Sequence, residues 1–123
     1  MKHLLPWLLI STLAFPAFAE VKSYDQAIHD AAREGSGDDV RRLLKADPKQ
    51  REARTSMGST PLHLAATNPD TSAMKALIAA GADVMARDND GATPLHMAAY
   101  SSRPKNTQLL LEAGADPMAK TDN

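Results

Sequence analysis

The 123-residue chain contains no cysteine, and only 4% of its residues are aromatic. The absence of cysteine excludes disulfides, thiolate zinc sites, a cysteine nucleophile and a lipid-modified N-terminal cysteine. The scarcity of aromatic residues predicts a core of Leu, Ala, Val, Ile and Met, which is typical of closely packed helices. The chain also lacks an excess of charge of one sign, with 14 Lys and Arg, 15 Asp and Glu, and a formal net charge of −1. Because nucleic-acid binding needs a dominating basic face, we expect no nucleic-acid partner.

A long hydrophobic run occurs only at the N-terminus. Lys2 precedes an almost wholly apolar stretch at residues 4–15, and the small residues Ala17 and Ala19 match the pattern that signal peptidase reads. A transmembrane anchor is the alternative, but residues 4–19 include two prolines and fall short of the about 20 residues needed to span the hydrocarbon core. We therefore predict a cleavable signal peptide at residues 1–19, export to the periplasm or secretion, and no stable membrane anchor after cleavage.

The rest of the chain repeats itself. The pattern Thr-Pro-Leu-His-x-Ala-Ala at residues 60–66 recurs 33 residues later, and Ala-Gly-Ala-Asp at residues 80–83 recurs with the same shift. A glycine stands two residues before each Thr-Pro pair. A weaker copy begins at Ile28, with one extra residue in the loop that follows it. A fixed period of this length predicts a stack of similar structural units.

This pattern resembles the ankyrin repeat. The resemblance covers about residues 24–123 and implies an all-α solenoid of about three stacked helix-turn-helix repeats with short β-hairpin loops. We place the repeat domain at residues 20–123, with repeats at approximately 24–57, 58–90 and 91–123. Two positions depart from the family, because Pro69 and Ser102 stand where a glycine usually separates the two helices of a repeat.

The residues of the repeat explain the predicted helices. Pro61 and Pro94 suit the first turn of a helix, where a missing N–H has no cost, and the threonine before each suits a helix cap. Gly81 and Gly114 suit the left-handed position that ends a helix. We expect Met74 and Met97 to fill the core, whereas Met57 falls at a loop tip.

Three histidines, His29, His63 and His96, recur at one position of the repeat, which raises the question of a metal site. Stacked repeats would space them about 10 Å apart, too far for shared coordination. The resemblance implies instead that each histidine bonds to the preceding threonine and to the backbone of a neighbouring repeat. No hydrolase elbow, phosphate loop or metalloprotease helix occurs. We therefore predict no enzyme activity, no metal and no cofactor, and rank a small-molecule site last.

The resemblance places partner contacts beside the glycine of each loop and just after each Ala-Ala pair. The best single anchor is Tyr100, because an exposed tyrosine offers a large contact area with a polar tip. The alternative is a face that is merely solvated. The residues at these positions are Arg54, Ser56, Met57, Ser59, Thr67, Asn68, Arg87, Asn89, Asp90, Ala92, Tyr100 and Ser101.

The sequence therefore predicts a non-enzymatic module that binds a protein partner in the periplasm. Small exported bacterial ankyrin-repeat proteins are similar to this chain, and two roles are open among them: neutralising a toxin or supporting a periplasmic enzyme. We expect a monomer. The alternative is a structural protein that associates with itself, because the last repeat stops at Asn123 and leaves the apolar residues 109–111 short of a covering neighbour.

Overall fold

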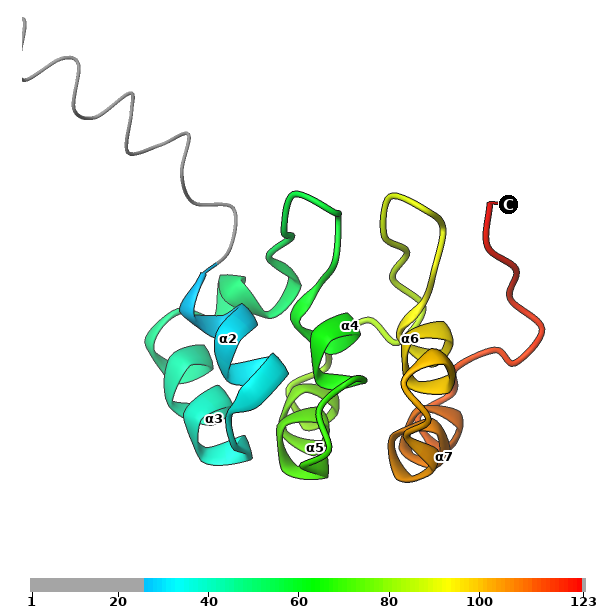
Figure 1. Ribbon diagram of the computed structural model, residues 1–123. Coiled ribbons are helices and arrows are strands. Elements are labelled where there is room, and N and C mark those ends of the chain that lie inside the picture. Colours follow the sequence, from blue (N-terminus) through cyan, green and yellow to red (C-terminus); the bar gives the residue numbers. More distant parts are fainter. Residues whose placement is uncertain (1–25, 123) are drawn as a thin grey trace, which may run out of the picture.

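The computed structural model describes residues 26–122, which form a row of helix pairs (Figure 1). The predicted signal peptide at residues 1–19 lies outside the described residues. The first helices of the three pairs lie in one layer, the second helices lie in another, and the loops project from the edge nearer the first helices (Figure 1). The elements are α2 (Ala27–Glu34), α3 (Gly37–Ala46), the 3₁₀ helix η1 (Pro48–Glu52), α4 (Pro61–Ala65), α5 (Thr71–Ala79), α6 (Pro94–Tyr100) and α7 (Pro104–Glu112).

The start of each repeated first helix follows the sequence prediction. Pro61 and Pro94 occupy the first turn of α4 and α6, and Thr60 and Thr93 are the N-cap residues. The N-cap threonine and the histidine three residues later form a reciprocal capping box, which satisfies N–H groups that a helix leaves without partners. The repeated motif therefore sets the position at which each helix begins.

Backbone turns with positive φ end the second helices. Gly81 has a φ of 86° and Gly114 a φ of 99°, as the glycine pattern predicts. Ser102 has a φ of 54° in the turn between α6 and α7, so a serine there adopts the conformation that glycine prefers. Pro69 does not adopt a positive φ, and the chain passes from α4 to α5 by a different turn.

The core lies between the two helix layers. Its largest fully buried side chains include Ile28, Leu62, Leu77 and Leu110. Met74 is fully buried and Met97 packs partly against the same cluster, which confirms their predicted role as core residues. Buried alanines separate these larger side chains, and their small size lets neighbouring helices approach closely. The core continues from one helix pair to the next, so adjacent pairs bury each other's facing side chains.

The projecting loops do not form the expected β-hairpins. The loop before α4 closes with a bond from Thr55 N to Ser59 O (3.0 Å), and the loop before α6 closes with one from Asp88 N to Ala92 O (2.9 Å). Residues 26–122 contain no β-strand. The extra residue of the first repeat falls in the segment that contains η1, which connects α3 to the first loop.

Candidate functional site

The loop edge of the stack, which we define as residues 53–60, 86–93 and 119–122, carries most of the predicted contact residues. Gly58 and Gly91 turn the first two loops with φ values of 76° and 78°. A Cβ atom at Gly58 would collide with the Asn89 side chain of the next loop. Glycine is therefore required there both by the backbone conformation and by the close approach of the neighbouring loop.

Two arginines bind adjacent loops together. Nη1 of Arg54 donates to the carbonyl of Gly58 in its own loop (2.8 Å) and to that of Arg87 in the next loop (2.5 Å). Arg87 repeats this arrangement, because its Nη1 donates to the carbonyls of Gly91 (2.9 Å) and Lys120 (2.5 Å). We call this pair of arginines the arginine ladder. Both residues are exposed at the predicted contact face, but their guanidinium groups already bond to loop carbonyls and hold adjacent loops together.

The loop tips are also joined through their backbones. The N–H of Asn89 donates to the carbonyl of Met57 (3.0 Å), and the Asn89 side chain donates to the carbonyl of Ser56 (3.0 Å). One repeat further on, the N–H of Asp122 donates to the carbonyl of Asp90 (3.0 Å). These bonds hold the tips in one arrangement, so the face needs little reordering when it meets a partner.

Two large side chains are exposed at the predicted contact positions, one on this edge and one at the far end of a first helix. Met57 is 60% exposed at the first tip, and Tyr100 is 79% exposed at the end of α6. Ser56 and Asp90 are exposed as predicted, whereas Thr67 and Ser101 are half-buried. Exposed aromatic and methionine side chains are enriched at protein interfaces.

Three predicted contact residues are buried, and the prediction is wrong for them. Ser59 is 7% exposed and Ala92 is 7% exposed, because each lies where the loop turns back under its own tip. Asn68 is 3% exposed, since its Nδ2 donates to the carbonyls of Ala32 (3.0 Å) and Gly35 (3.1 Å) at the end of α2. The last carbonyls of a helix lack partners within the helix, and Asn68 supplies one from the next repeat.

Thr67 also forms hydrogen bonds within the fold. Its hydroxyl donates to the carbonyl of Leu64 (2.7 Å), and its own carbonyl accepts a bond from Nε of Arg103 (3.0 Å). The positions after the Ala-Ala pair therefore serve the junction between repeats in the middle copy. In the last copy the corresponding segment carries the exposed Tyr100.

Sequence reasoning missed Asn106, which is 1% exposed in α7. Its Nδ2 donates to the carbonyls of Ala65 (3.3 Å), Ala66 (3.0 Å) and Asn68 (2.9 Å), at the end of α4. These three acceptors fix the orientation of the amide and leave its Oδ1 buried without a partner in the described part of the chain. A signal was present, since Asn106 lies four residues before Leu110 on the apolar stripe of the helix.

The recurring histidines have the predicted structural role. The N–H of Thr60 donates to Nδ1 of His63 (3.1 Å), so Nδ1 is an acceptor and the proton lies on Nε2, which donates to the carbonyl of Ala92 (2.8 Å). His29 forms the same pair of bonds, with the N–H of Gln26 (2.9 Å) and the carbonyl of Ala53 (2.8 Å). Each ring therefore joins a helix start to the loop that follows.

The electrostatic state of His63 follows from this geometry. Burial disfavours the imidazolium and lowers the pKa of His63 below its usual value of 6.5, and the charge of Arg54 acts in the same direction. The bond to Ala92 and the carboxylates of Asp88 and Asp83 act in the opposite direction but do not outweigh burial. His63 is therefore a neutral structural ring at neutral pH.

His96 differs from its two counterparts. Its Nδ1 accepts a bond from the N–H of Thr93 (3.0 Å), which again leaves the proton on Nε2. Within residues 26–122, no carbonyl accepts a bond from that Nε2. The ring is only half-buried, whereas His63 is fully buried.

Neither a metal centre nor a membrane span is found in the part of the chain that the structure describes. No three His, Asp or Glu side chains there lie close enough to hold a metal ion. No helix there has the length and apolar character to cross a membrane.

The fold and the recurring bonds agree with a comparison to known families. A family model described as ankyrin repeats (3 copies) matches residues 28–121. None of the curated proteins compared with the chain matches it. The match includes both loops, all three histidines and the arginine ladder.

Proposed function

Because the chain belongs to the ankyrin-repeat family, whose repeats generally act as protein–protein interaction modules, we propose that it binds a folded protein partner through its loop edge and first helices. Repeats of this family are typically non-enzymatic. The observation that supports this site most directly is the exposure of Met57 (60%) on a frame of bonded loops and of Tyr100 (79%) at the end of the first helix α6. A rigid frame that displays large side chains lowers the entropic cost of association.

We place this binding outside the cytosol, in the periplasm of a bacterium. The support is the sequence pattern of residues 1–19. Expression of the full chain in a bacterial host tests the proposal. Mass spectrometry of the protein released from the periplasm is expected to give a mature N-terminus at Glu20. Recovery of the uncleaved chain in the membrane fraction would contradict it.

Two partner classes fit this proposal: a toxin that the protein neutralises, or a periplasmic enzyme that it supports. Both need a stable complex with a folded protein, and the loop edge is suited to either. Purification with a candidate partner separates them. A toxin partner would lose activity in the complex, whereas a supported enzyme would gain activity or lifetime.

The binding face is tested by exchanging its two anchors. Periplasmic extract is passed over immobilised protein that carries Met57→Ser and Tyr100→Ser, and over the unchanged protein. Because buried anchors each contribute more than about 1 kcal/mol, the double variant is expected to lose about tenfold or more in affinity and to release the partner. Met118→Ser is the matched control, since Met118 is 75% exposed outside the loop tips.

Two results would contradict this face. One is a wild-type column that retains no stoichiometric protein from the extract. The other is equal retention by the Met57→Ser/Tyr100→Ser variant and by the control. Circular dichroism of both variants shows whether the fold is kept, and we expect unchanged helix content because both anchors are exposed.

Self-association is the second candidate, and the observation that favours it lies at the last helix pair. Leu111 is 43% exposed on α7, and Nε2 of His96 has no acceptor among the described residues. A second copy could cover both. Light scattering at micromolar concentration is expected to show a dimer that Leu111→Glu dissociates. A strict monomer at these concentrations would exclude this function.

A further inference from the structure

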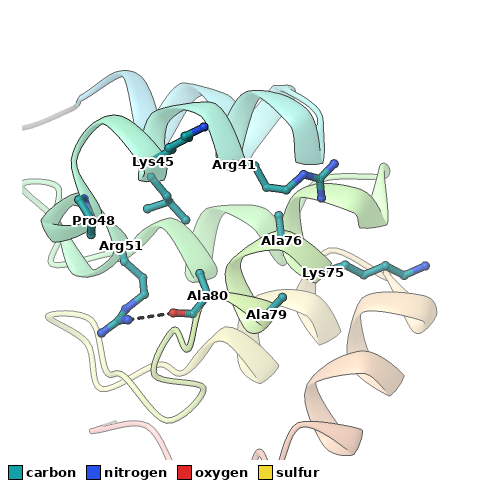
Figure 2. Close-up of a pocket in the computed structure, with 9 residues that line it drawn as sticks. Arg41, Lys45, Pro48, Arg51, Lys75, Ala76, Ala79 and Ala80 are labelled. Carbon is teal, nitrogen blue, oxygen red and sulfur yellow. Dashed lines mark hydrogen bonds between the residues drawn. The ribbon is translucent and has the colours of Figure 1, made fainter.

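A groove lies on the second-helix layer, away from the loop edge. It runs between α3 and α5, is bordered by η1, and has a volume of about 560 Å³ (Figure 2). Its floor is apolar and built mostly of small residues: Leu44, Ala76, Ala79 and Ala80, with Pro48 at the border. A floor of alanines allows the backbone of another helix to approach closely.

The rim of this groove is positively charged. Arg41, Lys45, Arg51 and Lys75 line it, and no acidic side chain of residues 26–122 does so. Four cations around one groove contrast with a formal net charge of −1 for the whole chain. Such a concentration of one sign attracts an anionic occupant and raises its rate of association.

The neighbouring acids neutralise this rim only in part. Asp38 pairs with Arg41, and Glu52 pairs with Arg51 at 3.2 Å. Lys45 and Lys75 form no ion pair within the described part of the chain. The carboxylate of Asp70 accepts a bond from the N–H of Ser72 at 2.9 Å, which lowers its pKa. The charge of Lys75 lowers that pKa further, but Asp70 forms no ion pair with Lys75.

The positions of the cations show the shape of the occupant. Figure 2 shows Arg51 at one end of the groove and Arg41 and Lys75 toward the other, with Ala79 and Ala80 between them. Arg51 is held in place, because its Nη1 donates to the carbonyl of Ala80 (2.9 Å). An amphiphile with a single anionic head would use only one end. An elongated occupant with acidic groups along its length would use both.

We propose that this groove binds an acidic amphipathic helix of a protein partner. The apolar side chains of that helix lie on the alanine floor, and its carboxylates meet Arg51 at one end, Arg41 and Lys75 toward the other, and Lys45 between them. This is the helix-in-groove mode of recognition with complementary charge at the rim. The groove lies on α3 and α5, so this second contact does not depend on the loop edge.

A designed peptide tests the proposal on the mature chain. The probe is a fluorescent helical peptide of Leu, Ala and Glu with all leucines on one face, and its partner probe has Gln in place of every Glu. We expect fluorescence anisotropy to show binding of the Glu peptide, with an affinity that falls as salt is added. We expect the Gln peptide to bind about tenfold more weakly or not at all.

Charge reversal on the protein locates the contact. Lys45→Glu and Lys75→Glu, each made singly, are expected to weaken the Glu peptide about tenfold or more. The matched control for each single reversal is Lys120→Glu, which makes the same change in net charge at an exposed lysine outside the groove. We expect the control to change the affinity by less than about twofold, because distant exposed charges are screened.

A steric variant tests the floor without changing charge. Ala79→Trp fills the groove at an exposed position, so it is expected to leave the thermal unfolding curve unchanged and to weaken the peptide about tenfold. Ala46→Trp, at an exposed position of α3 that does not line the groove, is the control. The variant Met57→Ser/Tyr100→Ser, which changes the loop edge and the end of α6, is expected to keep full peptide binding, which separates this inference from the proposed function.

Four results would overturn the inference. These are no binding of the Glu peptide, equal binding of the Glu and Gln peptides, equal loss in the groove and control variants, and displacement of the peptide by an equal concentration of dodecanoate. The last result would assign the groove to a fatty acid, and the first would show that its charge recruits no helix.

Discussion

The middle and last repeats share almost the same first helix, yet the two helices lie in different environments. Leu62 is 1% exposed and His63 is fully buried in α4, whereas Leu95 and His96 are only half-buried in α6. Ala66 is fully buried, but its counterpart Ala99 is exposed. The motif is the same in both copies, so it does not decide burial. The neighbour on the far side decides it, as expected for a linear stack in which each unit contacts only the next.

The hydrogen bonds differ in the same way. His63 uses both ring nitrogens, one within its own repeat and one toward the next loop. His96 uses only Nδ1 among the described residues. A histidine of the repeat thus stabilises the fold in two ways: through a bond within its own repeat and through a bond to the next repeat, where one is present. The difference between identical substitutions in the two repeats measures the second contribution.

The largest effect is expected for His63→Ala compared with His96→Ala. The first substitution leaves the N–H of Thr60 and the carbonyl of Ala92 without a partner in a buried site and creates a cavity, so we expect a loss of about 3 kcal/mol. The second removes only the local contacts with Thr93 at a half-buried site, and we expect about 1 kcal/mol. Urea unfolding measures both. Equal losses would show that the neighbour adds nothing.

A smaller loss is expected for Asn106→Leu, which removes the amide that caps the end of α4 from the last repeat. Three buried carbonyls lose their donor, but the orphaned Oδ1 of Asn106 is removed as well, so we expect about 2 kcal/mol. Gln108→Leu, at an exposed position of the same helix, is the control and should change stability by less than about 0.5 kcal/mol. A loss below that of the control would mean that Asn106 does not join the repeats.

The pH dependence of stability is expected to reflect His63 at the centre of the stack. Because its pKa is lowered below 6.5 in the folded protein, the unfolded chain binds more protons than the folded one as the pH falls below about 6.5. The contribution of the neutral ring is complete above that pH and is lost toward the folded pKa. Titration of the His63 ring by NMR measures this directly. A midpoint at or above 6.5 would contradict the buried, neutral ring.

The smallest effect is expected in the turn of the last repeat. Ser102 has a φ of 54°, which is strained for a residue with a side chain, so Ser102→Gly should stabilise the protein by about 0.5–1 kcal/mol. Ser101 next to it has a φ of −86°, and Ser101→Gly should therefore destabilise the protein slightly. Thermal unfolding of the two variants compares them. A stabilising Ser101→Gly would show that chain flexibility, not φ, governs this turn.

Much of the fold was predictable because the repeat motif contains local signals. The helix starts at Pro61 and Pro94, the left-handed glycines at 81 and 114, and the bond from Thr60 to His63 all follow from residues close together in the chain. The exposure of Met57 and Tyr100 agrees with their predicted places in the repeat. Whether they contact a partner stays a prediction.

The remaining features depend on contacts between repeats that no local pattern reveals. Asn68 and Asn106 are buried because the helix end beside each presents carbonyls that need a donor. Arg54 and Arg87 looked like free contact residues, but each reaches the backbone of the following loop. The cationic groove likewise depends on how α3 packs on α5. In each case the sequence shows the donor or the charged residue, but it does not show which group of the neighbouring repeat lies next to it.

The arginine ladder also bears on how new specificities could arise on this frame. Arg54 and Arg87 bond to carbonyl oxygens, which every amino acid has, so the bonds do not depend on the identity of the tip side chains. Ser56, Met57 and Asp90 are exposed beside them and are therefore open to exchange. A library randomised at these three positions should retain folding in most members. Selection could then change the target while the architecture is inherited intact.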